Sequence, residues 1–445
     1  MTQLDIAPPA PITTAPAGSA PIATPPADRP LRILIGADTF PPDVNGAAQF
    51  ARRLAVGLAR LGHEVHVVCP ATATDVGATV DDGIIVHRLP AHRTPVHPTF
   101  RVCLPWRARR AVAALLDGLR PDVVHAQAHF IVGRALINEA ARRRVPVVAT
   151  NHFMPENLFD YAKIPRRLRT YAARKAYADL ARVFARADRV TAPTPRAAEL
   201  LRQGGLPMEV TPVSCGIDID KYRRVSAVTD RPTILFVGRL DEEKNVDRLI
   251  RAHAMLPDTL EARLEIVGDG SQRDRLEALA GELGARDRVR FLGYAPDDEL
   301  LRAYARATVF AMPGTAELQS LVTMEAMSAG KPVVAADAMA LPHLVRHGRN
   351  GFLFPPADVS ALAARLADVL EAPPAIRGRM GAESGRIIAA HAIGATLETF
   401  EGIYREIIGT GARRAVADRA VRMAGTAGAA GTSGTTGTAG VARVA

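Results

Sequence analysis

The order of apolar segments along the chain constrains the fold more than any other feature of the sequence. From Leu31 to about Pro212, short β-rich apolar runs such as Ile33–Ile35 alternate with segments whose apolar residues recur at helical spacing. The same alternation resumes at Thr233. Strands separated by helices pair in parallel through right-handed crossovers. Each half of the chain is therefore predicted to form an α/β domain with a doubly wound parallel sheet.

Composition shifts suggest how the chain is divided. Residues 1–29, rich in Pro and Ala, and residues 424–445, rich in Gly, Ala and Thr, are predicted to be disordered tails. The first domain is expected over residues 30–212 and the second over residues 213–390, followed by helices in residues 391–423. A chain of 445 residues with 48% hydrophobic content is sufficient for two buried cores.

Several compositional features narrow the class of protein. No apolar run reaches the length of a membrane-spanning helix, and the N-terminal tail lacks the basic start and apolar core of a signal peptide. The three cysteines, Cys69, Cys103 and Cys215, have no metal-binding spacing, and an odd number argues against a disulfide framework. We therefore expect a reducing, cytoplasmic environment and no metal site.

The net charge of +10 at pH 7 leaves two interpretations open. The larger cluster of basic residues lies on a predicted helix that has apolar residues at helical spacing. A second, smaller basic cluster occupies residues 107–110. Such a helix suits an anionic lipid surface, although it is equally typical of a solvated face on an ordinary domain helix. Nucleic acid is not an expected partner, because aromatic residues make up only 5% of the chain and no recognised nucleic-acid module is present. The basic residues of the predicted helix are Arg166, Arg167, Arg169, Arg174 and Lys175.

The segment from Pro313 to Leu344 has the pattern of a loop, a helix, a glycine stop and a buried strand. Glu317 and Glu325 stand eight positions apart, and Ser320 between them is a candidate N-cap. A helix N-terminus offers unpaired N–H groups and partial positive charge to an anion. Eight residues span about 12 Å at helical rise, so a diphosphate fits between the two glutamates. Each carboxylate would then accept a hydroxyl pair, one from a hexose and one from a ribose, which indicates a nucleotide-sugar site.

Two further segments supply groups that such a site needs. The apolar run Thr233–Val237 is followed by Arg239 and Lys244 before the next helical pattern. Both cations would lie at the carboxyl edge of a parallel sheet, where they could neutralise a pyrophosphate. A second strand closes on Gly268, where the absence of a side chain would let a base or ribose approach the backbone.

These motifs, in this order, resemble the family-4 retaining glycosyltransferases of the GT-B type. The second half contributes VGRLDEEKN, VGDG, the Glu-x7-Glu element and GRNGFLFPPAD, and the first half contributes a first strand with the loop Phe40–Gly46, GHEVHVV, PDVVH and TNHF. The resemblance covers about residues 30–410, and its specificity comes from the recurrence of several motifs in one order. It implies two Rossmann-like domains facing each other across a cleft, with the last helices crossing back to the first domain.

The resemblance also implies a role for each candidate residue. Arg239 and Lys244 would hold the donor diphosphate and stabilise the leaving group in place of a metal, without a cofactor. Glu325 would accept the ribose hydroxyls, and Glu317 would hold hydroxyls of the transferred sugar. His152 takes the place of a family histidine beside the donor sugar, near the reaction centre. The other expected donor-binding residues are Gly46, Gly268, Ser320, Leu321 and Val322.

The expected reaction is the transfer of glucose or mannose from a UDP- or GDP-sugar, with retained anomeric configuration, to a hydroxyl acceptor. The segments Thr150–Asn157 and Ala340–Leu344, together with Leu318 and Gln319 after the first glutamate, resemble members that modify diacylglycerol or phosphatidylinositol. Most members have Ser-Phe-Gly after that glutamate. With the basic helix, this favours a lipid acceptor and a peripheral position at the inner face of the plasma membrane.

Three alternatives stay open. A soluble acceptor, such as an inositol phosphate or a sugar phosphate, would keep every donor residue. A non-hydrolysing sugar-nucleotide epimerase would share the architecture, but its acid/base residues are not evident in the sequence. A non-catalytic nucleotide-binding protein is disfavoured by the presence of Arg239, Lys244, Glu317 and Glu325, because such groups are costly to cluster without a ligand.

Overall fold

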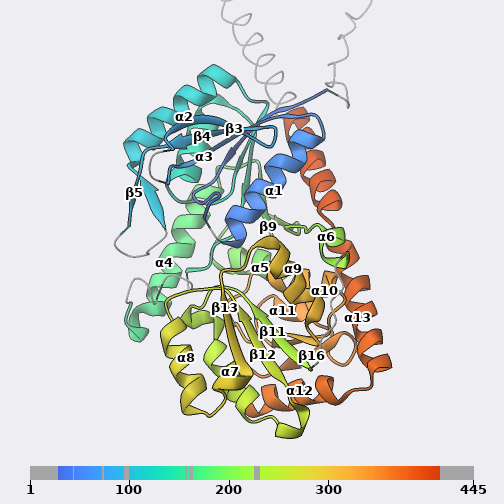
Figure 1. The fold of residues 1–445 in the computed structure, drawn as a ribbon. Coiled ribbons are helices and arrows are strands. Elements are labelled where there is room, and N and C mark those ends of the chain that lie inside the picture. Colours follow the sequence, from blue (N-terminus) through green and yellow to red (C-terminus); the bar gives the residue numbers. More distant parts are fainter. Residues whose placement is uncertain are drawn as a thin grey trace, which may run out of the picture. The chain divides into compact units, whose positions relative to one another are not determined.

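The computed structural model describes residues 29–43, 45–72, 75–94, 100–155, 159, 164–224 and 231–410. Pro30–Ile408 forms one compact unit (Figure 1). The predicted tails, residues 1–28 and 424–445, lie outside the described residues, as do residues 411–423.

The first half of the chain forms an eight-stranded sheet with the strand order β10-β9-β8-β7-β1-β2-β4-β3. Every neighbouring pair is parallel except β3 and β4 at one edge. Two short strands form a separate antiparallel pair, β5 (Ala91–Arg93) with β6 (Arg101–Cys103). The strands of the large sheet are β1 (Arg32–Gly36), β2 (Glu64–Pro70), β3 (Gly77–Asp81), β4 (Ile84–Leu89), β7 (Val123–Ala126), β8 (Val147–Thr150), β9 (Arg189–Ala192) and β10 (Val210–Pro212).

The second half forms a six-stranded sheet with the order β13-β12-β11-β14-β15-β16. All its strand pairs are parallel. The prediction of two doubly wound parallel sheets is confirmed. The strands are β11 (Thr233–Val237), β12 (Arg263–Val267), β13 (Val289–Gly293), β14 (Val309–Met312), β15 (Val333–Ala336) and β16 (Gly351–Phe354).

Most strands are followed by a helix, except β2, β3, β4 and β5, each of which is followed by another strand. In the first half they are α1 (Gly46–Arg60), α2 (Pro105–Leu119), α3 (Ile131–Arg143), α4 (Arg166–Phe184) and α5 (Pro195–Gln203). Further along the chain they are α6 (Ile219–Arg223), α7 (Val246–Ala254), α8 (Arg273–Glu282), α9 (Asp297–Arg306), α10 (Leu321–Ser328), α11 (Leu341–Leu344), α12 (Val359–Glu371) and α13 (Pro374–Ile388), with a short 3-10 turn η2 (Glu242–Lys244). Residues 393–410 are also helical.

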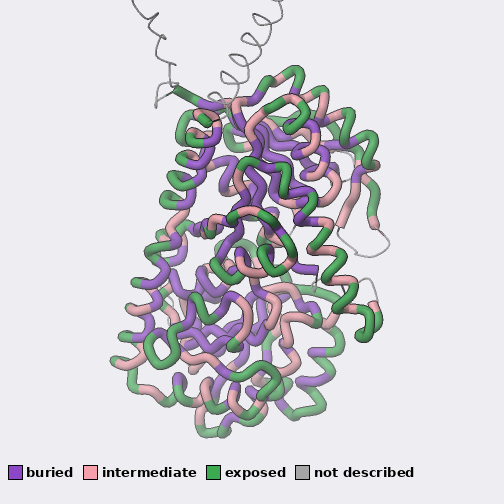
Figure 2. Tube along the Cα trace, turned by 180° about the vertical axis from the view of Figure 1, so that it is seen from behind, coloured by how far each residue is buried: buried purple, intermediate pink, exposed green. Residues whose placement is uncertain are grey.

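Both faces of the first sheet are buried, as a doubly wound fold requires. Alternate residues of β1 point to opposite faces: Leu34 packs with α2, α3 and α4, whereas Ile33 and Ile35 pack with α1 and residues 393–410. The second half has its own core, around β11, β12, β14 and β15. Figure 2 shows these buried segments surrounded by exposed helix faces.

The helix at residues 393–410 is in contact with the first half of the chain. Its Phe400 ring lies 6.0 Å from Phe50 of α1, and Tyr404 Oη lies 2.6 Å from Nδ1 of His125 in β7. His125 is fully buried, and burial lowers its pKa to about 3. The ring is therefore neutral at pH 7 and joins β7 to this helix.

Candidate active site

The N-terminus of α10 follows Ser320, whose backbone is left-handed, with φ 58° and ψ 79°. The Ser320 hydroxyl is 2.8 Å from Thr323 Oγ1 and makes no side-chain cap bond to the helix backbone. Ser320 thus has the predicted position but not the predicted bond, because the left-handed turn directs its hydroxyl toward Thr323. Without a side-chain cap among the described residues, the first N–H groups of α10, at Leu321 and Val322, can serve an anion.

Glu317 and Lys244 are joined directly. Lys244 Nζ lies 2.5 Å from Glu317 Oε1. The side chains are 17% and 9% exposed, respectively, so this ion pair is shielded from water. Lys244 ends the turn η2 after β11, while Glu317 lies in the loop between β14 and α10. The structure therefore brings a predicted cation and a predicted carboxylate to the same place from loops after adjacent strands.

Arg239 is paired with two carboxylates of its own loop. Its guanidinium lies 2.5 Å from Asp241 Oδ2 and 3.0 Å from Glu243 Oε1. Burial raises the pKa of Glu243, while the charges of Arg239 and Lys244 oppose that rise. A phosphate at Arg239 would compete with Asp241 and Glu243 for the guanidinium.

Glu325, one turn into α10, is held by tyrosines. The Tyr304 hydroxyl donates to Glu325 Oε2 at 2.8 Å, and the Tyr222 hydroxyl lies near the same carboxylate. Burial raises the pKa of Glu325, and the two phenols together with the charge of Arg53 oppose the rise. The local sequence pattern contains no signal for Tyr222, Tyr304 or Arg53, because all three lie in other elements.

His152 follows β8 in a partly buried position. Its Nε2 lies 2.9 Å from Gln127 Oε1, and its Nδ1 lies 3.9 Å from Cys215 Sγ. The ring centroid is 4.9 Å from that of Phe50. Burial lowers the pKa of His152 to about 4, so the imidazole is neutral at pH 7.

Hydrogen bonds tie the Glu317 loop to the first half of the chain. Thr194 Oγ1 donates to the carbonyl oxygen of Leu318 at 2.9 Å. Gln319 accepts from the backbone N–H of Cys215 at 2.8 Å and donates to Ser214 Oγ at 2.7 Å. Through Cys215, this loop also meets His152. The sequence marked Leu318 and Gln319 as unusual in this family, but it did not indicate these contacts.

Of the two predicted glycines, only Gly268 lies at a close approach of the backbone. A Cβ atom on Gly46, at the start of α1, would stand 3.5 Å from Leu321 Cδ1, so this helix start lies beside the start of α10. Gly268 has φ +132°, and a Cβ atom there would be 1.9 Å from the carbonyl oxygen of Gly238. Gly268 is therefore required for packing between two turns, whatever ligand approaches it.

The predicted basic helix corresponds to α4. Leu168 and Tyr171 are 48% and 54% exposed, and the charged ends of Arg174 and Lys175 each lie 5.6 Å from the Tyr171 ring centroid. Arg166 and Arg167 are exposed, while Arg169 is partly buried and donates to the carbonyl oxygen of Ile164.

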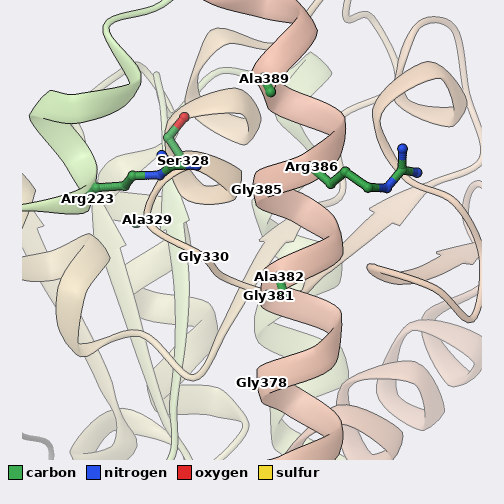
Figure 3. Close-up of a pocket in the computed structure, with 10 residues that line it drawn as sticks. All are labelled: Arg223, Ser328, Ala329, Gly330, Gly378, Gly381, Ala382, Gly385, Arg386 and Ala389. Carbon is green, nitrogen blue, oxygen red and sulfur yellow. The ribbon is translucent and has the colours of Figure 1, made fainter.

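A cavity of about 600 Å³ lies at the other end of α10, and none of the predicted donor residues lines it. Figure 3 shows Arg223 of α6 reaching toward Ser328, while Arg386 of α13 points away. Most of its lining consists of small residues and backbone, and we assign it no part in the donor site. The other lining residues are Ala329, Gly330, Gly378, Gly381, Ala382, Gly385 and Ala389.

Over the described part of the chain, no group of three or more His, Cys, Asp or Glu side chains could hold a metal ion. None of the described helices is both long enough and apolar enough to cross a membrane.

Comparisons with known proteins identify the family. The model "Glycosyltransferase Family 4" matches residues 44–221, and "Glycosyl transferases group 1" matches residues 218–384. A GDP-mannose-dependent alpha-mannosyltransferase of Mycobacterium tuberculosis is 33% identical over 337 residues, covering 73% of this chain and 84% of the relative. A D-inositol 3-phosphate glycosyltransferase of Catenulispora acidiphila is 31% identical over 357 residues, covering 74% and 82%.

The fold has solved counterparts. Sucrose-phosphate synthase from Thermosynechococcus elongatus superposes with a TM-score of 0.71, covering 85% of this chain and 99% of that one, at 22% identity. The chain has two parallel sheets, matches both family models and is about one third identical to its relatives over the aligned residues. It therefore belongs to the family-4 glycosyltransferases of the GT-B type and is a hexosyltransferase.

Proposed function

We propose that this glycosyltransferase uses a nucleotide-sugar donor and transfers mannose from GDP-mannose. The observation that carries the proposal is the uncapped start of α10 next to the Lys244–Glu317 ion pair. This arrangement offers an anion site and a carboxylate for sugar hydroxyls within one loop. The choice of GDP-mannose is supported by the mycobacterial relative, which is named for that donor and is 33% identical.

In this proposal the diphosphate lies at the first N–H groups of α10, next to Lys244 and Arg239. Lys244 then exchanges its contact with Glu317 for a phosphate oxygen, and the freed carboxylate accepts mannose hydroxyls. The two cations stabilise negative charge on the leaving diphosphate. We propose that they do so without a metal or an organic cofactor.

The transfer is proposed to retain the anomeric configuration through attack on the same face. The bond from the anomeric carbon to the phosphate oxygen breaks with its electron pair on the diphosphate, and the acceptor oxygen bonds to the same carbon. The acceptor proton passes to the departing phosphate oxygen. His152, as a neutral imidazole, offers a hydrogen bond to a sugar hydroxyl without adding charge.

For the acceptor, we propose a membrane lipid that carries a free hydroxyl, such as diacylglycerol or phosphatidylinositol. Exposed Leu168 and Tyr171 on α4, flanked by basic side chains, support docking on an anionic surface. The enzyme would then work at the cytoplasmic face of the plasma membrane. Three free cysteines are consistent with a reducing compartment.

An inositol phosphate is the second candidate acceptor. The D-inositol 3-phosphate glycosyltransferase relative is 31% identical and is named for such an acceptor. In that case the basic side chains of α4 would be an ordinary solvated face.

One assay tests donor and acceptor together. The full chain is incubated with GDP-mannose, UDP-glucose or UDP-N-acetylglucosamine, and with phosphatidylinositol or diacylglycerol vesicles or inositol 3-phosphate. We expect mannose transfer to lipid from GDP-mannose, with an α-linked product by nuclear magnetic resonance, and thermal stabilisation by that donor. A donor at 100 times its Kd should stabilise the chain by about 2.7 kcal/mol. Transfer to inositol 3-phosphate alone would replace the lipid proposal, and unchanged transfer and donor affinity in Lys244→Ala and Glu325→Ala would overturn the site.

A further inference from the structure

Tyrosines from two different elements lie at the Glu325 carboxylate. Tyr304 of α9 donates to Oε2 at 2.8 Å and also lies 3.2 Å from the carbonyl oxygen of Val322. Tyr222 of α6 lies near the same carboxylate, and the two groups shift each other's pKa. The two rings are 5.6 Å apart at 87°, so each ring supports the orientation of the other.

Both tyrosines are buried deeply enough to remain donors. Tyr304 is 0% and Tyr222 6% exposed, and burial raises the pKa of each phenol far above its ordinary range. An ionised carboxylate has about four lone-pair sites. The hydrogen bond from Tyr304 occupies one of them, so enough sites remain for both hydroxyls of a ribose.

The positive charges near this group come from both halves of the chain. Lys221 lies on α6 next to Tyr222, and Arg53 lies on α1, and both favour the ionised form of Glu325. Among the described residues, Nε and Nη2 of Arg53 are buried and have no hydrogen-bond partner. Arg53 favours the ionised carboxylate through its charge.

We propose that Tyr222 and Tyr304 are positioning residues for donor recognition, and that they hold the Glu325 carboxylate in the orientation that accepts both ribose hydroxyls. The inference rests on the proposed function and on the contact with the ribose hydroxyls that the family resemblance implies for Glu325. Neither tyrosine touches the donor in this proposal. Their effect must therefore disappear when the ribose hydroxyls are removed.

The test compares GDP with 2′,3′-dideoxyguanosine diphosphate, which lacks both hydroxyls, by calorimetric titration of the full chain. The wild type should bind GDP about 100-fold more tightly, since two hydrogen bonds to a charged group are lost in the analogue. Glu325→Gln should remove most of this preference. Tyr304→Phe and Tyr222→Phe should each reduce it about 3- to 10-fold by weakening GDP binding alone.

Tyr404→Phe provides a matched control, because Tyr404 is a fully buried tyrosine that bonds His125, away from Glu325. It should leave the preference for GDP unchanged. If Tyr304→Phe does not fold, as its melting curve would reveal, Tyr222→Phe still decides the matter.

The outcomes separate the two proposals. If Tyr304→Phe and Tyr222→Phe weaken the binding of GDP and of its dideoxy analogue equally, or change the binding of neither, the tyrosines have only a structural role and the inference is wrong. If the wild type shows no preference for GDP over the dideoxy analogue, or if Glu325→Gln keeps the full wild-type preference, Glu325 does not hold the ribose and the assignment beneath it fails as well. If GDP does not bind but UDP does, the same comparison is made with UDP and its dideoxy analogue.

Discussion

The ammonium nitrogen of Lys244 lies 2.5 Å from Oε1 of Glu317. The residue predicted to bind the diphosphate and the residue predicted to bind the sugar therefore neutralise each other's charge. The two residues are 73 positions apart and come from loops after adjacent strands, β11 and β14. This pairing keeps two buried charges from being isolated, which would be costly. It also means that changing either residue alters both parts of the proposed donor site.

Replacing Lys244 by Met should lower kcat/KM for mannose transfer about 100-fold or more, because a group that stabilises the leaving diphosphate is lost. Glu317 would also lose its partner. Arg302→Met is the control, since Arg302 is exposed and pairs with Asp298 and Glu299 of its own helix. Steady-state kinetics measure both variants, and an equal effect of the two would refute the assignment of Lys244.

Gln319→Ala should loosen the loop that carries Glu317. Gln319 is only 4% exposed and bonds both Cys215 and Ser214, so its loss leaves buried polar groups unsatisfied, at a cost of about 1–3 kcal/mol. We expect a lower free energy of unfolding in urea and a lower kcat.

Gln203→Ala is the matched control for this experiment, because Gln203 is exposed and bonds only Glu199. Its stability and kcat should stay at the wild-type values. A Gln319→Ala variant that is less stable but has full kcat would show that the bonds serve the fold alone.

Gly268→Ala should disrupt the turn that follows β12. The new Cβ would meet the carbonyl oxygen of Gly238 at 1.9 Å, and the backbone has φ +132°. Backbone strain of this kind costs about 1–3 kcal/mol, before the collision is counted. Gly281→Ala in α8 meets no atom within 4 Å and should be neutral or stabilise by up to about 1 kcal/mol. Thermal unfolding of the two variants provides the comparison.

The stability of the chain should fall on acidification below pH 6.5. Burial lowers the pKa to about 4 for His129, His152 and His391 and to about 3 for His125. These rings bind protons more readily in the unfolded chain, so their contribution is complete above pH 6.5 and is lost as the pH falls toward 4. Each pKa difference corresponds to about 3 kcal/mol or more at the acid limit.

One carboxyl group works in the opposite direction. Burial raises the pKa of Asp38 to about 6, so its contribution is present below about pH 4 and is lost as the pH rises through 6. The four histidines together change the free energy of unfolding with pH more than this one carboxyl group does. Urea unfolding at pH 7 and pH 5 measures the sum, and His129→Phe should reduce the difference between the two values. A difference that His129→Phe leaves unaltered would contradict this account.

Removing charge from α4 should weaken binding to anionic vesicles. Each basic residue near such a surface contributes about 1 kcal/mol, so Arg174→Gln with Lys175→Gln should reduce vesicle affinity about 30-fold. Arg107→Gln with Arg110→Gln removes the same charge from α2 and is the control. Flotation with phosphatidylglycerol vesicles measures binding, and equal losses in both pairs would indicate a non-specific charge effect.

The sequence by itself determined the two doubly wound sheets, because strand and helix periodicity and glycine turns are local properties of the chain. It also located the start of α10 at Ser320, since capping residues act within a few positions of a helix end. The hydroxyl contact of Ser320 with Thr323 was not predictable, because it depends on a left-handed backbone conformation.

Only the tertiary structure decided which side chains meet. Lys244 with Glu317, Tyr304 with Glu325 and Gln319 with Ser214 join residues 73, 21 and 105 positions apart. Such pairs follow from strand order and from the rotamers that burial permits, and no short-range pattern encodes either. For that reason the sequence indicated Glu325, whereas the two tyrosines that hold it emerged only once α6, α9 and α10 were packed together.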